Sequence, residues 1–410
     1  MINKNNFGFI IFLTILSSVN LIIVGLSFQG LSNNYALGKH TLSIFIQLPF
    51  LTFVYLISVN FFKISNNKSL VYTAATIIPS LFLLSKFFFN ELNFFEEDNL
   101  RYDLLAKYYL ENKTLVANSA FTIQPGYSYY LTLLLFFFDD QSRLSQILNI
   151  FICFVSIVIF LNFIKNYNLK KIEKYFIYYL IFASTFFLSK NIIFCISEWL
   201  YLSIIFSLPV LLIKEKYRTI ALLLGFSVLI RTNYVIVITF LSIIIFFFNR
   251  RKINLIIYFI IILSPFFHNL IFHKEYALFI TDQYVDVAFH YSVFQGFNEF
   301  LEYSSNHLLS YFALSKNYLP NHEWLNTSFF IAILSLPFFS FYFIYKFFKF
   351  DLINKIIFVI LFTTTVGVTY LFGWAYYPRF QITNYLTIFV ILICINILKD
   401  RYKYLNLYSI

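Results

Sequence analysis

Long apolar runs recur along this chain, and they constrain its fold more than any other feature. The first three cover residues 7–28, 43–62 and 70–89. Because about 20 helical residues, at about 1.5 Å each, cross the apolar layer of a bilayer, each run is long enough to be a transmembrane helix. Only 12% of the residues are charged, whereas soluble globular proteins have about 25%. The sequence therefore predicts an all-α polytopic membrane protein.

Basic residues in the short links between runs predict how the helices are oriented. Lys63 and Lys68 lie between the second and third runs, and links rich in Lys and Arg face the cytoplasm. The N-terminus then faces the cytoplasm too, and residues 90–142 face the outside. The first run lacks a small-residue cleavage site, so we expect a retained helix and not a signal peptide. The net charge of +11 follows from this topology and does not indicate a nucleic-acid partner.

The orientation of everything further along depends on whether residues 127–138 cross the membrane. A run of about 12 apolar residues is short for a crossing and is typical of an interfacial or re-entrant helix. A crossing would also move sixteen basic residues outside and bring only six inside, against the charge rule. We therefore expect a juxtamembrane helix on the outer face. The sixteen are Lys165, Lys170, Lys171, Lys174, Lys214, Lys216, Arg218, Arg250, Arg251, Lys252, Lys346, Lys349, Lys355, Lys399, Arg401 and Lys403.

With that segment outside, nine further runs complete a fold of about twelve transmembrane helices with both chain ends in the cytoplasm. Residues 1–69 are expected to form two N-terminal helices. Residues 70–398 form the membrane domain with outer loops at 90–142 and 273–326, and residues 399–410 a cytoplasmic tail. Under this topology fifteen of the nineteen acidic residues lie outside, which places the chemistry there. The nine runs are 144–164, 175–188, 192–213, 219–230, 232–248, 253–272, 328–345, 356–372 and 382–398.

The first outer loop opens on three adjacent carboxylates, Glu96, Glu97 and Asp98. Such a cluster is costly beside a membrane because the charges repel one another and lose hydration, so it favours a functional use. The alternative is a solvated cluster that starts a helix over residues 99–111, because carboxylates stabilise helix N-termini.

Several motifs follow in a fixed order. Tyr102 and Ala106 lie four and eight residues after Asp98, Gln124-Pro125-Gly126-Tyr127 opens the short helix, and Arg143 heads the next one. In this order the chain resembles the GT-C superfamily of integral-membrane glycosyltransferases, in the branch of protein O-mannosyltransferases and lipid A aminoarabinose transferases. It departs from that pattern at Asn99, where a second acid is usual, and in residues 1–69, which exceed the family's single leading helix. Weaker matches are Ser197-Glu198, Arg231 and Pro378-Arg379-Phe380.

The resemblance implies a transferase that takes a sugar from a polyprenyl-phosphate donor. The acceptor would be a hydroxyl on a lipid, a glycan or a protein, reached from the outer face of a bacterial inner membrane. Asp98, with Glu97 beside it, would be the general base. Arginine offers a planar fork for phosphate oxygens, which Arg231 and Arg379 would supply, with Arg143 and Lys190 behind them. Further substrate-binding candidates are Tyr102, Gln124, Tyr127 and Glu198.

No cofactor is expected, and no divalent metal site is evident. The six histidines show no ligand spacing, and Cys153, Cys195 and Cys394 all lie within apolar runs, where we expect packing roles.

Some alternatives stay open at this point. Glu198 is equally able to cap a span or pair with Lys190, and Arg231 and Arg379 are placed where arginines often reach lipid headgroups. A lipid-linked sugar flippase or transporter is a competing class, although such proteins usually place ionisable residues in the middle of the membrane. An O-antigen polymerase or ligase is another, but its large, arginine-bearing outer loop typically comes late in the chain, where residues 273–326 carry only Lys274 and Lys316.

Overall fold

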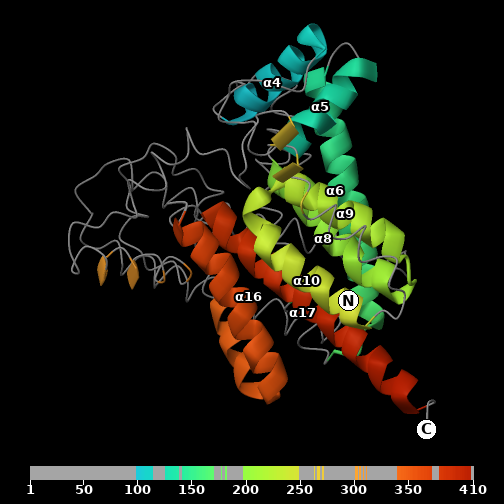
Figure 1. The fold of residues 1–410 in the computed structure, drawn as a ribbon, viewed down its shortest axis with the longest axis vertical. Helices are drawn as coiled ribbons and strands as arrows, with labels where there is room; N and C mark the ends of the chain where they lie inside the picture. The colour runs from blue at the N-terminus through green and yellow to red at the C-terminus, as the bar shows by residue number, and fades with distance from the viewer. Residues whose placement is uncertain are drawn as a thin grey trace, which may run out of the picture.

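The computed structural model describes residues 98–113, 125–137, 141–169, 197–248, 339–371 and 378–407, with a few single positions at 177, 181 and between 263 and 311. Over these residues the chain is helical throughout and contains no strand (Figure 1). The predicted helices at 7–28, 43–62 and 70–89, with most of those at 175–188 and 253–272, lie outside the described residues. The predicted number of twelve transmembrane helices therefore stays a prediction.

Two parallel helices form the centre of the described bundle. α6 (Gln141–Asn166) and α8 (Ser197–Ile213) lie side by side. The Ser156 and Ser203 hydroxyl oxygens are 3.2 Å apart, and the Phe160 and Phe206 rings stack with centroids 4.9 Å apart. The later residue of α6 contacts the later residue of α8, so the two helices run in parallel.

Three more helices pack around this pair. A tight turn after α8 leads into α9 (Tyr217–Ile230), which packs back along α8. α9 is followed by the 3₁₀ turn η4 (Thr232–Tyr234) and by α10 (Val235–Phe248). The long α17 (Pro378–Leu407) lies against α8, where the Thr387 hydroxyl donates to the Tyr201 hydroxyl at 3.3 Å. α16 (Leu352–Leu371) packs on α10 and α17.

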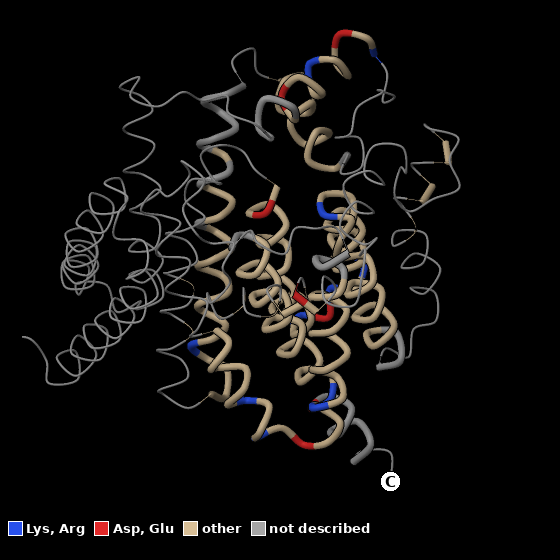
Figure 2. Tube along the Cα trace, turned by 90° about the vertical axis from the view of Figure 1, so that its left-hand side faces the viewer, with Lys and Arg blue, Asp and Glu red and all other residues tan. Residues whose placement is uncertain are grey.

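Basic residues mark one end of this bundle. α6 ends after Lys165, the turn from α8 to α9 carries Lys214 and Lys216, and Arg218 lies in the first turn of α9. The Lys399 ammonium donates to Asn354 Oδ1 at 2.7 Å, which joins the start of α16 to the end of α17. Burial, with the Asp400 carboxylate nearby, raises the pKa of Tyr167 to about 12, so the ends of α6 and α17 also lie together. In Figure 2 most charged positions outside α4 lie in the lower half of the bundle.

The opposite end carries a helical hairpin. α4 (Asp98–Asn112) packs on α5 (Pro125–Phe137), and the first turn of α5 contacts the last residues of α9. α5 then leads into the start of α6, whose other end lies at the basic end. α5 thus starts and finishes at the same end of the bundle, as a segment that does not cross a membrane would.

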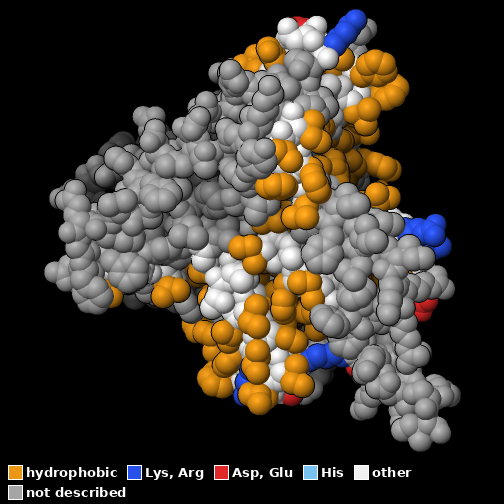
Figure 3. All heavy atoms as spheres, viewed as in Figure 1, with side chains coloured by type: hydrophobic (Ala, Val, Ile, Leu, Met, Phe, Trp, Pro, Cys, Tyr) orange, Lys and Arg blue, Asp and Glu red, His pale blue; other side chains and the backbone are white. Residues whose placement is uncertain are grey.

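One helix of the described part, Phe380–Asp400 with 21 residues, is long and apolar enough to cross a membrane. The apolar stretches of the other described helices are shorter, among them those of α9 and α10, which have 14 residues each. Large apolar side chains cover the outside of the bundle around the start of α16 and on α5 (Figure 3), including Phe348, Leu352 and Phe136 at 74%, 73% and 68% exposure.

Several predicted boundaries differ from the structure at the polar ends of helices. α16 starts at Leu352 and not at residue 356, and α17 continues to Leu407, through most of the predicted tail at 399–410. An apolar run marks only the apolar part of a helix, whereas polar residues extend it without changing the backbone hydrogen bonds. The predicted helix at 99–111 is present as α4, one residue longer at each end.

Candidate functional site

The start of α5 is held against α9 by a close backbone contact. A Cβ at Gly126 would lie 2.8 Å from the Ile230 amide nitrogen, so only glycine fits there. Pro125 is the first residue of α5, a position where proline's missing N–H costs nothing. Tyr127 is fully buried. The predicted Gln124-Pro125-Gly126-Tyr127 element thus brings the hairpin to Ile230, next to Arg231; Gln124 itself lies outside the described residues.

Helix α4 is placed through its tyrosines. The Tyr102 ring meets the Tyr127 ring edge-on, with centroids 5.1 Å apart, and Tyr102 and Ala106 are buried. Residues spaced by four lie on one helical face, so Asp98, the first residue of α4, falls on the face that carries Tyr102 and Ala106. Glu97 lies outside the described residues. The position of Asp98 also fits the alternative reading, in which its carboxylate stabilises the helix N-terminus.

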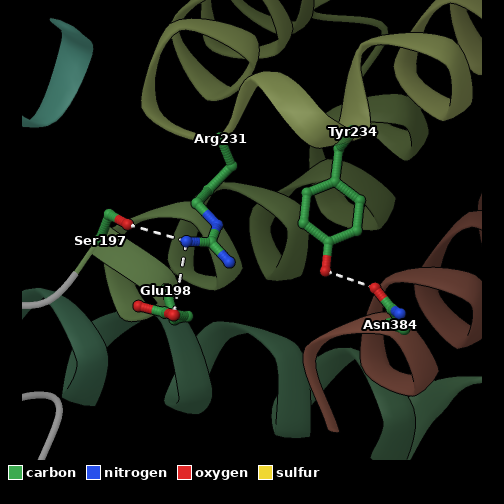
Figure 4. Close-up of polar contacts among 5 residues, drawn as sticks. All are labelled: Ser197, Glu198, Arg231, Tyr234 and Asn384. Atoms are coloured by element: carbon green, nitrogen blue, oxygen red, sulfur yellow. Dashed lines mark hydrogen bonds and ion pairs between the residues drawn. The ribbon is translucent and has the colours of Figure 1, made fainter. Parts of the chain in front are cut away.

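A buried ion pair lies beneath this hairpin, at the start of α8 (Figure 4). Arg231 Nη1 is 3.4 Å from Glu198 Oε1, and the two side chains are 4% and 0% exposed. The same Nη1 donates to the Ser197 hydroxyl at 3.4 Å. Two buried charges lose much hydration, and removing either partner would leave the other uncompensated. Arg231 follows the last residue of α9 with an extended backbone, φ −138°, which turns its side chain toward α8.

The Nε–Nη2 edge of the Arg231 guanidinium takes no part in the ion pair. Its Nε and Nη2 atoms are buried and have no hydrogen-bond partner among the residues that the structure describes. The Phe380 ring lies 5.0 Å from the guanidinium carbon, which stabilises the cation without using its N–H groups. Nε–H and Nη2–H point the same way and form the planar fork that binds two oxygens of a carboxylate or phosphate.

A second buried polar cluster lies beside the pair. The Tyr234 hydroxyl donates to Asn384 Oδ1 at 2.6 Å, as Figure 4 shows, and Asn384 Nδ2 donates to the Tyr311 hydroxyl at 2.8 Å. Tyr311 lies in the predicted outer loop 273–326 but is only 1% exposed, so this position belongs to the core. Sequence analysis missed this network. The signal was Asn384 itself, a polar side chain inside the apolar run 382–398.

Some of the predicted site residues lie together in the structure, and others are placed only by their position on a helix. Tyr102, Tyr127, Glu198 and Arg231 gather at one end of the bundle, with Phe380 of the Pro378-Arg379-Phe380 motif against Arg231. Arg379 is therefore adjacent in sequence to a residue of the site. Arg143 is the third residue of α6. Since Ser156 lies level with Ser203, Arg143 lies about two helical turns beyond the start of α8, farther out than the buried pair.

Of the two open alternatives for Glu198, only capping can be compared with the structure. Glu198 lies in the first turn of α8, as a capping acid would, and its ion-pair partner is Arg231; Lys190 lies outside the described residues. Within the described part of the chain no group of three His, Cys, Asp or Glu side chains is placed to hold a metal ion.

The site therefore combines an oxyanion-binding fork, a carboxylate that fixes it, and an apolar enclosure formed by the hairpin and α17. The chemistry of such an arrangement suits an anionic group, because the fork offers two parallel N–H donors away from water. No family model, curated protein sequence or solved structure matches this chain.

Proposed function

We propose that this protein is a polytopic membrane glycosyltransferase that moves a sugar from a polyprenyl-phosphate donor to a hydroxyl acceptor. The observation that carries this proposal is the Arg231 guanidinium, which bonds Glu198 and Ser197 through Nη1 alone. It is buried at the end of the bundle to which the Asp98 helix is docked, and its Nε–Nη2 edge has no partner among the described residues. A departing lipid phosphate needs a dry, fixed cation of this kind.

In this proposal the carboxylates and the arginine have separate tasks. The acceptor hydroxyl passes its proton to Asp98 as its oxygen forms a bond to the anomeric carbon. The bond from that carbon to the phosphate oxygen breaks, and its electron pair leaves on the polyprenyl phosphate, where Arg231 receives the charge. Glu198 holds the guanidinium in place from the opposite side. Arg379 and Arg143 would contact the phosphate farther out, and Tyr102, Gln124 and Tyr127 would shape the donor cleft.

The surface supports a membrane location. Large apolar side chains on the outside of α16 and α5 are exposed, and contiguous exposed apolar surface is typical of regions that face lipid or protein. The basic residues gathered at one end would face the cytoplasm of a bacterial inner membrane, which leaves the site facing the periplasm. The acceptor would be a lipid, glycan or protein, and the polyprenyl chain would lie along the apolar helices.

One observation favours a second candidate, a transporter of lipid-linked sugars. The Glu198–Arg231 pair is enclosed by protein, and ionisable residues buried in a membrane domain often mark a transport path. We rank it second because both residues lie at helix ends, at the rim of the bundle. A transport path would place them midway.

A donor screen tests the proposal. Purified protein in lipid nanodiscs is incubated with radiolabelled polyprenyl-phosphate sugars, and released lipid phosphate is measured. We expect release with at least one donor, loss of release in Asp98→Asn with donor binding retained, and loss of both in Arg231→Leu. Asp103→Asn is the matched control on the same helix, where Asp103 pairs only with Lys107 among the described residues. Folded protein that releases nothing from any donor, yet moves a lipid-linked sugar across proteoliposomes, would establish the transporter instead.

A further inference from the structure

A buried amide lies two residues after Arg231, in the turn η4. Asn233 is 4% exposed, and in the described part of the chain neither its Oδ1 nor its Nδ2 has a hydrogen-bond partner. Buried amides are almost always hydrogen-bonded, because leaving the donor and the acceptor unmet costs the hydration they had in the unfolded chain. An amide buried in this state is able to make hydrogen bonds to a ligand without giving up any bond to the described residues.

The neighbouring asparagine differs in this respect. Asn384 is also buried, and its Oδ1 and Nδ2 are both bonded, to Tyr234 and Tyr311. Tyr234 is the residue that directly follows Asn233. The fold therefore gives the Asn384 amide both of its hydrogen bonds. It leaves the Asn233 amide without a partner among the described residues, although Asn233 is next to Tyr234 of the bonded network.

The open amide and the open edge of Arg231 belong to the same turn, two residues apart in the chain. Two residues of extended chain span at most roughly 7 Å between Cα atoms, so the two side chains start from neighbouring points of one turn. Arg231 offers two donors that suit an oxyanion, and Asn233 offers one donor and one acceptor. A ligand that matches both carries a negative charge next to a neutral group that donates and accepts, such as a sugar hydroxyl or acetamido group.

We propose that Asn233 binds the sugar of a glycosyl phosphate whose phosphate lies on Arg231, and so sets the preference for the sugar over the bare lipid phosphate. This inference rests on the proposed function for the identity of the donor. It assigns the phosphate to Arg231 and the sugar to Asn233, so the two contacts are separable by mutation.

Binding of two probes tests the proposal. The probes are a panel of short-chain polyprenyl-phosphate sugars and the same short-chain polyprenyl phosphate without sugar, each titrated into wild-type protein in nanodiscs. We expect Asn233→Leu to weaken binding of the preferred sugar-bearing probe by roughly tenfold or more, the loss of one or two hydrogen bonds, and to leave the bare phosphate unchanged. Arg231→Leu combined with Glu198→Leu, which removes the phosphate contact without leaving a buried charge unpaired, should weaken both.

Stability distinguishes this role from a structural one. Replacing an unbonded buried amide by an apolar side chain of similar size removes an unmet donor and acceptor, so Asn233→Leu without ligand should melt at the wild-type temperature or above it. Asn384→Leu, the matched control, should melt lower. A lower melting temperature in Asn233→Leu with unchanged affinities would overturn the proposal, as would an equal loss for both probes or a wild type that binds neither.

These outcomes are independent of turnover. If the sugar-bearing probe binds through Asn233 but no phosphate is ever released, the proposed transferase activity fails and the inference stands. If phosphate is released by the wild type, and Asn233→Leu binds the donor as tightly as wild type does, the inference fails and the transferase stands.

Discussion

Two buried polar clusters meet at the turn η4, and they differ in how fully their hydrogen bonds are met. Around Tyr234, Asn384 and Tyr311 each amide atom and hydroxyl has a partner. Around Arg231 and Asn233, four nitrogen and oxygen atoms have none among the described residues. Both clusters are more than nine-tenths buried, so exposure to water does not explain the difference.

Under the proposed function, the difference separates a structural task from a binding task. A fully bonded network inside an apolar bundle fixes the elements it joins, here η4, α17 and the segment around Tyr311. A cluster with open donors is costly until a ligand meets them, and the bonded network beside it holds the turn so that it does not collapse. The bonded cluster thus supports the open one.

The largest expected effect comes from breaking the buried ion pair. Glu198→Leu leaves the Arg231 cation uncompensated and should lower the free energy of unfolding by about 3–5 kcal/mol. The measurement is detergent or thermal unfolding of purified protein. Glu198→Leu combined with Arg231→Leu should recover most of that loss, because both charges are removed together. A double variant no more stable than Glu198→Leu would contradict the pairing seen in the structure.

The bonded network gives the next largest effect. Asn384→Leu leaves the buried hydroxyls of Tyr234 and Tyr311 without their partner, at about 1–3 kcal/mol for each group. Unfolding of this variant should be compared with that of Asn233→Leu, in which no hydrogen bond is lost. If the two variants are equally destabilised, the distinction between a bonded and an open cluster is wrong.

Disturbing the contact between α5 and α9 should have an intermediate effect on stability. Gly126→Ala places a methyl 2.8 Å from the Ile230 backbone, so α5 must shift, at a cost of about 1–3 kcal/mol, and the donor release assay should lose activity. Gly367→Ala is the control, since nothing lies within 4 Å of an added Cβ there, and alanine in a helix is expected to be neutral or to stabilise by up to about 1 kcal/mol. Equal effects of the two variants would mean that the hairpin is not held at Gly126.

Much of the local structure was predictable from sequence, because it depends on short-range signals. The helix at 99–111, the short helix at 127–138 and the break at Arg231 follow from apolar periodicity, a carboxylate at a helix start and a single polar residue between apolar runs. The structure has them as α4, α5 and the turn η4. Glu198 and Arg231 were each selected as site residues by their place in a motif order.

Their pairing was not predictable, and neither was the network. Tyr234 and Asn384 are 150 residues apart, and no periodicity in either apolar run specifies that the two runs meet. Tyr311 falls in the segment 273–326, which was predicted as an outer loop because it lies between two apolar runs, yet it is buried against α17. Hydropathy specifies which segments are apolar, whereas side-chain packing between distant segments determines which polar groups meet.

The smallest expected effect comes from an ion pair that water reaches. Asp103 and Lys107 on α4 are 2.7 Å apart with side chains 13% and 44% exposed, and they have the i,i+4 spacing of helix surface pairs. Lys107→Ala should cost no more than about 0.5 kcal/mol, and the cost should shrink as salt is added. The Glu198→Leu loss should not change with salt, because that pair is enclosed by protein. Unfolding of both variants at low and high salt measures this contrast, and a salt-dependent loss at Glu198 would show that solvent reaches the site.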